Sequence, residues 1–164
     1  GALVKEIFEG LDCELELEPG RWIVGNAGLM VASVIYLKEG EGRNFLIIDA
    51  AMNDLIRPAL YDAHHEIIPV NKPISNTHFM PFEIVGPVCE TGDTFANQRQ
   101  MPNVQSGEML AFKSAGAYGS VMASEYNTRP MIPEVLVSGN KFSIIRARPS
   151  VQDIIDRDII PDWL

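Results

Sequence analysis

The chain has 164 residues, of which 46% are hydrophobic and 21% are charged, a composition typical of a globular domain. Its 13 Lys and Arg residues against 22 Asp and Glu residues give a net charge of −9, which argues against a nucleic acid or an anionic membrane as a partner. Two cysteines, Cys13 and Cys89, are too few for a disulfide framework. Because the sequence has neither a signal peptide nor a run of about 18 apolar residues, we expect a cytoplasmic protein with no membrane partner.

The first 25 residues predict one helix and one strand. Apolar residues at positions 3, 4, 7, 8 and 11 recur at the spacing of one helical face. Over residues 13–18, apolar residues alternate with glutamates before Pro19-Gly20, which predicts a short strand that ends in a turn. A helix followed by a strand is typical of α/β structure.

The remainder predicts mainly antiparallel β structure. Two β-rich runs at 31–37 and 44–49, joined by a glycine-rich turn, predict a hairpin. Further strands are predicted over residues 65–70, 82–88, 108–113, 134–138 and 141–148. We therefore expect a Greek-key sandwich or barrel with short helices. The short helices are predicted within 52–61, where Pro58 limits the length or lies in the first turn, and after Ser150, where Asp153 completes an approximate capping box.

The segment Glu18-Pro-Gly-Arg21 is a candidate ligand-binding turn. Gly20 allows a ligand to approach the backbone closely, and the guanidinium of Arg21 suits a carboxylate or a phosphate. A turn with an ordinary surface arginine explains the same residues equally well.

A second candidate anion site lies in the predicted helix. Arg57 and Tyr61 are four residues apart, so on a helix they share one face and could bind one anion together. An ordinary pair on a helix surface is the alternative. Tyr118, between Gly116 and Gly119 in a short glycine-rich loop, either presents its hydroxyl to an anion or packs.

The loop around Cys89 and Glu90 has the residue types of an acid–base site. A thiol can deliver a proton, and an adjacent carboxylate can hold an ammonium. Taken alone, Cys89 is more often a buried apolar residue. The three histidines lack metal-ligand spacing, so no metal is expected, and the motifs of serine hydrolases, P-loop NTPases and simple dinucleotide-binding proteins are absent.

Several spaced motifs follow one another in a specific order. They are Glu18-Pro-Gly-Arg21, Asn26-Ala-Gly28, Asp49 with Met52-Asn-Asp-Leu-Ile-Arg-Pro-Ala-Leu-Tyr-Asp-Ala63, Val85-Gly-Pro-Val-Cys-Glu90 with Gly92-Asp93, Gly116-Ala-Tyr-Gly119, Ser124 with Tyr126-Asn127 and Arg129-Pro130, and Glu134-Val-Leu-Val137. In this order they resemble the C-terminal part of the diaminopimelate decarboxylases. Those enzymes belong to the fold-type III pyridoxal-phosphate group, which also includes ornithine decarboxylase and alanine racemase.

The resemblance implies an N-terminal (β/α)8 barrel followed by a C-terminal β domain, in a homodimer whose two subunits share each active site. Residues 1–25 would then be the last helix and strand of the barrel, and 26–164 the β domain. The rest of the barrel, including the lysine that forms the Schiff base, lies upstream in the family. We therefore expect the 164-residue chain alone to be inactive and not to bind pyridoxal 5'-phosphate, and to expose an apolar face around residues 1–30.

The resemblance also implies the reaction, which converts meso-2,6-diaminopimelate to L-lysine and CO2 in the last step of lysine biosynthesis. Cys89 would be the catalytic proton donor. The residues implied to contact the cofactor are Glu18, at the ring nitrogen, with Gly20, Arg21 and Tyr118. The residues implied to bind the amino-acid substrate are Arg21, Arg57, Tyr61 and Tyr118, with Glu90 at the distal ammonium.

Other members of the group stay open as alternatives. Ornithine decarboxylases carry Asp after the equivalent cysteine and lack the R-P-A-L-Y segment, so Glu90, Arg57 and Tyr61 favour diaminopimelate. Carboxynorspermidine and arginine decarboxylases share the chemistry. A different class is a non-catalytic module that retains the β domain for dimerisation or regulation.

Overall fold

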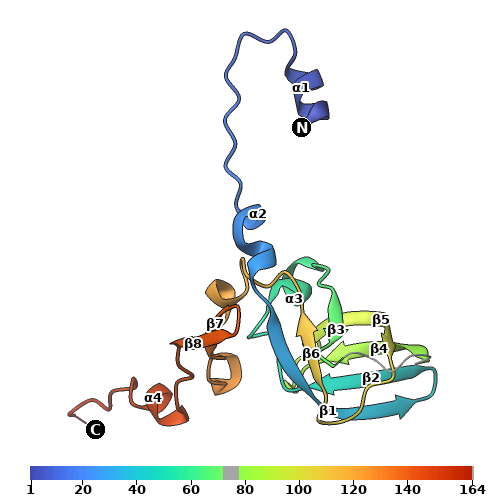
Figure 1. Cartoon of the computed structure of the whole chain (residues 1–164). Helices are drawn as coiled ribbons and strands as arrows, with labels where there is room; N and C mark the ends of the chain where they lie inside the picture. The colour runs from blue at the N-terminus through green and yellow to red at the C-terminus, as the bar shows by residue number, and fades with distance from the viewer. Residues whose placement is uncertain (72–77, 164) are drawn as a thin grey trace.

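The computed structural model describes residues 1–71 and 78–163, and one six-stranded sheet dominates it (Figure 1). The strand order is β3-β6-β1-β2-β4-β5. The strands are β1 (Met30–Gly40), β2 (Arg43–Ile48), β3 (Ile67–Pro69), β4 (Phe79–Val85), β5 (Thr94–Pro102) and β6 (Met109–Phe112). The expected mainly-β domain is confirmed.

One pairing departs from the expected antiparallel arrangement. β1 and β2 form the predicted antiparallel hairpin, in which Gly40 lies opposite Arg43 at the turn. β4, however, runs parallel to β2, with Phe45 opposite Glu83. The sheet is therefore mixed. The long connection between β2 and β4 returns the chain to the end of the sheet at which β2 began, so that β4 runs in the same direction as β2.

Strand β5 was not expected from the sequence. Its middle, Asn97 to Gln100, is a run of amide and guanidinium side chains, which resembles a loop. In the structure β5 is the edge partner of β4, with Phe95, Ala96 and Met101 buried and most of the polar run facing solvent. Pairing with β4 therefore determines this strand more than local propensity does.

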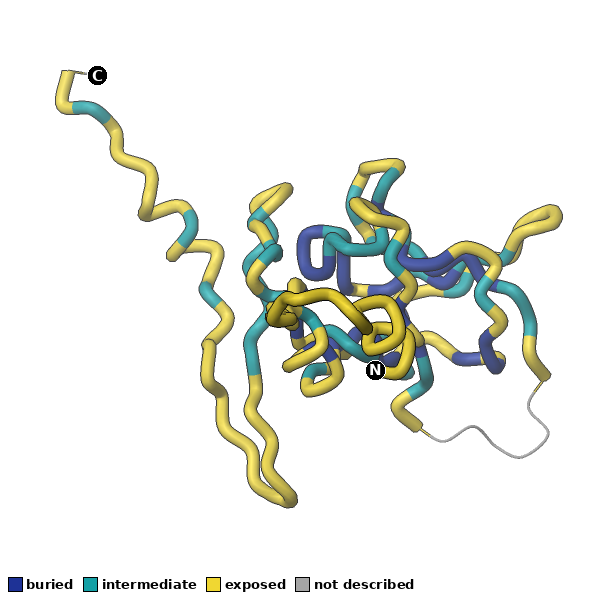
Figure 2. The backbone as a smooth tube through the Cα atoms, turned by 90° about the horizontal axis from the view of Figure 1, so that it is seen from above, coloured by how far each residue is buried: buried dark blue, intermediate teal, exposed yellow. Residues whose placement is uncertain are grey.

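The core lies against the sheet and gathers residues from all six strands. Phe95 of β5 and Phe112 of β6 pack with ring centroids 5.0 Å apart and planes tilted by 58°. Leu46, Ile48 and Ile84 have no exposed surface. Figure 2 shows the buried backbone concentrated in this part of the molecule and exposed backbone at both ends of the chain.

The N-terminal helix is confirmed, but the strand predicted after it is not. α1 spans Ala2–Phe8 and lies far from the sheet at the end of an extended segment (Figure 1). Residues 13–18 pair with no strand in the part of the chain that is described. Alternating apolar residues predict a strand only where a neighbouring edge supplies hydrogen bonds, and none lies beside this segment. Two short helical turns follow, α2 (Arg21–Val24) and η1 (Gly25–Ala27).

The C-terminal region has the predicted hairpin and helix. β7 (Glu134–Ser138) and β8 (Lys141–Arg146) form a separate two-stranded sheet, and α4 (Val151–Ile155) begins at a complete capping box between Ser150 and Asp153. Apolar side chains on both strands are exposed. No helix in the described ranges is long and apolar enough to cross a membrane.

Candidate active site

The backbone of the 20–28 segment lies directly against the glycine-rich loop 114–119. The amide of Ala115 donates to the carbonyl of Gly28 at 2.9 Å, and the amide of Gly116 donates to the carbonyl of Gly25 at 3.0 Å. A Cβ atom on Gly116 would lie 2.1 Å from the carbonyl oxygen of Val24. Only glycine permits this approach, which brings two candidate segments to one place.

Arg21 and Tyr118 meet at this junction. The Arg21 Nη2 atom donates to the Ser114 carbonyl at 2.9 Å, which fixes the guanidinium beside the loop. Tyr118 has a φ of 56°, and its hydroxyl lies 2.7 Å from the position that a Cβ on Gly20 would take. Tyr118 as a residue is 44% exposed, so this side of the junction is open to solvent.

Helix α3 (Arg57–Tyr61) adds a second arginine to the same cluster. Pro58 lies in its first turn, as expected, and Arg57 and Tyr61 share one face. The Arg57 guanidinium carbon lies 5.7 Å from the ring centroid of Tyr61 and 5.9 Å from that of Tyr118. The Nε atom of Arg57 is buried and has no hydrogen-bond partner among the described residues. A donor left unpaired in this way is suited to an anionic ligand.

Cys89 and Glu90 lie in a separate loop, residues 86–93, between β4 and β5. Both side chains are exposed, so the interpretation of Cys89 as a buried apolar residue is wrong. The Glu90 carboxylate accepts from the amide of Gly92 at 3.1 Å. The buried Asp93 ends the loop and accepts from backbone amides within and outside it.

Burial raises the pKa of the Asp93 carboxyl, whereas the hydrogen bonds that it accepts from the amides of Val88 and Met52 lower this pKa. The carboxyl of Asp54 is in a similar situation. Burial raises its pKa, and a bond from the Ala51 amide and the charge of Arg129 lower it. The Arg129 Nη2 atom lies 3.6 Å from the Asp54 Oδ2 atom.

His65 is a buried histidine close to the arginine cluster. It is 1% exposed, and its Nδ1 atom lies 2.9 Å from the carbonyl oxygen of Lys113. A carbonyl only accepts, so Nδ1 carries the proton and Nε2 is an acceptor, which has no partner within the described ranges. Burial lowers the pKa of His65, and the charges of Arg21 and Arg57 lower it further.

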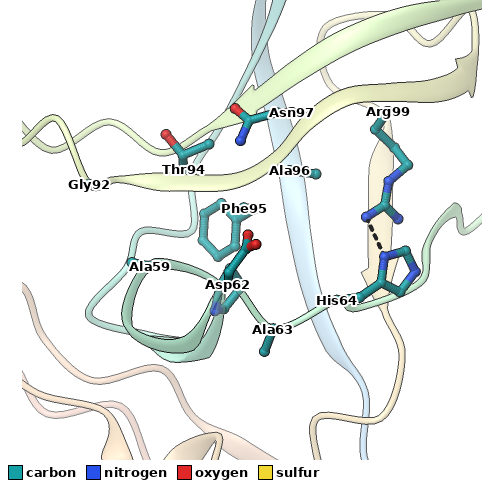
Figure 3. A pocket seen from close by; sticks show the side chains of 11 residues that line it. Ala59, Asp62, Ala63, His64, Gly92, Thr94, Phe95, Ala96, Asn97 and Arg99 are labelled. Atoms are coloured by element: carbon teal, nitrogen blue, oxygen red, sulfur yellow. Dashed lines mark hydrogen bonds between the residues drawn. The ribbon is translucent and has the colours of Figure 1, made fainter.

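Two pockets lie near these segments. One, of about 510 Å³, lies between α3 and β5, where Arg99 donates to the His64 ring at 3.1 Å (Figure 3). None of the predicted site residues lines it. The other, of about 260 Å³, is lined by Glu90 together with Met52, Asn53, Ile56, Ser124 and Tyr126.

The structure thus groups most, but not all, of the predicted site residues. One cluster contains Gly20, Arg21, Arg57, Tyr61 and Tyr118. Cys89 and Glu90 lie in the second loop, and Glu18 is exposed in the extended N-terminal segment. In residues 1–71 and 78–163, no group of three or more His, Cys, Asp and Glu side chains could hold a metal ion.

Three residues near the site received no role from the sequence, namely Asp93, Arg129 and His65. Their importance depends on burial and on partners distant in the chain, since Arg129 donates to Asn53 and to the carbonyl of Asp49. A Gly-Asp pair closing a loop and an Arg-Pro pair were the available signals, and neither indicates burial.

Comparison with protein families identifies the sheet domain. Residues 10–116 match the family model described as the C-terminal sheet domain of pyridoxal-dependent decarboxylases. The diaminopimelate decarboxylase of Zymomonas mobilis is 49% identical over 164 residues, which is the whole chain and 38% of that protein. The Aquifex aeolicus enzyme of that name is 46% identical over 94% of the chain and 36% of its own length.

Solved structures agree. The diaminopimelate decarboxylase of M. jannaschii in complex with L-lysine superposes with a TM-score of 0.84 at 37% identity, covering 99% of this chain and 37% of that one. The Helicobacter pylori enzyme, also complexed with L-lysine, gives a TM-score of 0.80 at 38% identity, over 94% of this chain and 37% of that one. The chain thus spans little more than a third of the relatives that it matches.

Substitution of Gly116 by Ala should disrupt the junction between the two backbone segments. The added methyl group would meet the Val24 carbonyl, so we expect a loss of about 1–3 kcal/mol in the free energy of unfolding, measured with urea. The matched control is Gly92→Ala, because a Cβ there meets no atom closer than 3.6 Å. Equal stability of the two variants would contradict the described contact.

His65 should make stability dependent on pH. Its folded-state pKa is lowered from 6.5 by burial, so between these two pKa values the unfolded chain binds more protons than the native chain. Neutral His65 therefore contributes to the free energy of unfolding above pH 6.5, and this contribution is lost as the pH falls through the folded-state pKa.

Urea unfolding at about pH 7.5 and about pH 5.5 tests this expectation. The wild type and the His64→Gln control should lose more stability at the lower pH than His65→Gln does. Identical pH dependence in all three proteins would show that His65 is not the group responsible.

Proposed function

The chain belongs to the pyridoxal-dependent decarboxylase family, and on this premise we propose that it is the C-terminal sheet domain of a diaminopimelate decarboxylase. The reaction would convert meso-2,6-diaminopimelate to L-lysine and CO2. The observation that carries the proposal is the Arg57 guanidinium, which lies against the rings of Tyr61 and Tyr118 and keeps a buried, unpartnered Nε atom. It is suited to bind a substrate carboxylate that does not react.

The residues present fit a part of the cofactor's binding site. The absent Cβ of Gly20 leaves space beside the Tyr118 hydroxyl, and Arg21 is fixed next to it, which suits a phosphate. Bound pyridoxal 5'-phosphate supplies an electron sink for the bond to the departing CO2. Glu18 would accept a hydrogen bond from the protonated ring nitrogen.

Arg21, Arg57 and Tyr61 would hold the distal carboxylate of the substrate. Two guanidinium groups and a phenol form an anion-binding site for this dianionic molecule, remote from the reacting carbon. Binding of the distal carboxylate there orients the end of the substrate that reacts. Glu90 would accept hydrogen bonds from the distal ammonium. Its exposed carboxylate, at the edge of the 260 Å³ pocket, is accessible for that contact.

Cys89 would supply the proton. Loss of CO2 leaves an electron pair on the carbon, and transfer of the proton from the Cys89 Sγ atom to this carbon completes the replacement of carboxylate by hydrogen. The exposure of Cys89 supports the role, because the thiol must reach a substrate outside its own loop.

We further propose that the active protein is a homodimer with shared sites, located in the cytoplasm. The contacts that the structure describes do not join Cys89 or Glu90 to Arg57, Tyr61 or Tyr118. This separation is expected if the Cys89 loop serves the site of a second subunit. Residues 1–25, whose first twenty are all exposed, would continue a preceding barrel, and residues 26–164 would form the sheet domain.

A chimera tests the proposal. This chain would replace the corresponding C-terminal 38% of the Zymomonas mobilis enzyme, and lysine formation from meso-diaminopimelate would be measured. We expect lysine production. Absence of activity in a folded chimera that binds the cofactor, or a preference for ornithine or arginine, would contradict the proposed substrate, and complete inactivity toward all of them would favour a non-catalytic module.

In this chimera, Cys89→Ala should lower kcat by about 100-fold or more and change KM little, because proton transfer belongs to the transition state. Cys13→Ala is the control, since Cys13 is exposed in the N-terminal segment and has no proposed role. An unchanged kcat in Cys89→Ala would exclude the thiol as the proton donor.

Glu90→Asp tests the choice of substrate. Shortening the side chain by one methylene withdraws the carboxylate from the distal ammonium without removing the charge, so kcat/KM should fall roughly tenfold or more. Glu41→Asp, in the β1–β2 turn, should leave kcat/KM unchanged. Full efficiency in Glu90→Asp would mean that Glu90 does not contact the substrate.

A further inference from the structure

We propose that Asp93 is a positioning residue that holds the loop bearing Cys89 and Glu90 against the segment that leads into helix α3. The bond to the segment before α3 stands on the structure alone, and its consequence for turnover rests on the proposed function. Asp93 was part of a motif in the sequence, but no role was attached to it. Its carboxylate accepts one hydrogen bond from each of the two segments.

The two carboxylate oxygens bind different segments. Oδ1 accepts from the amide of Met52 at 2.7 Å, and Oδ2 accepts from the amide of Val88 at 2.8 Å. Asp93 is only 3% exposed, so water does not compete freely for either bond. Hydrogen bonds from backbone amides to a buried carboxylate are among the stronger kinds in proteins. Because Val88 precedes Cys89, the second bond holds the backbone next to the residue that carries the thiol.

The loop is built around this carboxylate. The Gly86 amide donates to the Asp93 carbonyl, and the Asp93 amide donates to the Glu90 carbonyl, each at 3.0 Å. A Cβ atom on Gly86 would lie 2.3 Å from Asp93 Oδ2, so only glycine leaves space for the side chain beneath the loop. The loop therefore closes around the Asp93 side chain, which holds it in place.

The other end of the contact is also fixed. Met52 is followed by Asn53 and Asp54, and Arg129 donates to the Asn53 Oδ1 atom at 3.1 Å while lying 3.6 Å from Asp54. Asn53 in turn donates to the Ser124 carbonyl at 3.0 Å. Asp93 thus attaches the Cys89 loop to a segment that is itself held by Arg129 and Ser124 and that leads to Arg57.

An asparagine cannot replace the carboxylate in this geometry. Two backbone N–H groups require two acceptors, and an asparagine offers one oxygen and an NH2 group that would face an N–H. Asp93→Asn keeps the shape of the side chain, removes one acceptor and therefore breaks one of the two bonds. Asp62→Asn is a matched control, because Asp62 is an exposed residue at the end of α3 and the same charge is removed there.

Amide hydrogen exchange of the 164-residue chain, followed by NMR, tests the bridge that the Asp93 carboxylate forms between the amides of Met52 and Val88. This test does not depend on enzymatic activity. In Asp93→Asn, the amide of Met52 or Val88 should exchange at least about tenfold faster, since a broken bond leaves it free to open. The amides of the β1–β2 hairpin should not change, and Asp62→Asn should resemble the wild type. Unchanged exchange at both Met52 and Val88 would overturn the proposal.

Asp93→Ser is a second variant, to be used if Asp93→Asn does not fold. Its smaller side chain leaves room for water beside the two amides. Loss of the whole sheet in both variants would also overturn the proposal, because Asp93 would then support the fold as a whole and not one loop.

Turnover of the chimera shows whether the bridge acts through Cys89. Asp93→Asn should lower kcat about tenfold or more with a smaller change in KM, and Asp62→Asn should not. The variant that combines Cys89→Ala with Asp93→Asn should be no slower than Cys89→Ala alone, because a positioning effect needs the group that it positions. Additive losses would contradict the positioning role. An inactive chimera would overturn the proposed function, whereas hydrogen exchange would still decide for or against the bridge.

Discussion

The contact on which the candidate site depends most is the backbone approach between the 20–28 segment and the 114–119 loop. Gly28 and Gly116 lie so close that neither has space for a side chain, and two amide hydrogen bonds fix the junction. Without this contact, Arg21 would belong to an extended arm and Tyr118 to an unrelated turn. With it, Arg21 is bonded to the loop that carries Tyr118, and Tyr118 lies against Arg57, the first residue of α3.

A second constraint is the burial of polar groups beneath the loops. Asp93, Asp54 and His65 are almost fully inaccessible to solvent. Asp93 and His65 are each bonded to a backbone group of a segment distant in the chain, and Asp54 accepts from the nearby Ala51 amide and lies 3.6 Å from Arg129 Nη2. Such groups are costly when unpaired, so each favours one arrangement of the loops over others. The loop that carries the exposed Cys89 and Glu90 is thereby held by the buried Asp93, which has no proposed contact with the substrate.

Local patterns in the sequence predicted the β1–β2 hairpin, the β7–β8 hairpin and the capped helix α4, because turn and capping residues act over a few positions. They failed for β5 and for residues 13–18, where the outcome depends on whether a neighbouring strand is present. Arg57 and Tyr61 could be placed on one helix face from their spacing. Asp93 could not be assigned a role, because its partner Met52 is 41 residues away in the chain.

A crystal structure of the chimera with bound L-lysine tests directly whether Arg57, Tyr61 and Glu90 bind the distal end of the substrate. This product keeps the carboxylate and the ammonium that are distal in the substrate. We expect the carboxylate to contact Arg57 and Tyr61 and the ammonium to contact Glu90 of the partner subunit. A lysine carboxylate bound away from Arg57, or an ammonium without Glu90 beside it, would rule out the proposed mode of substrate binding.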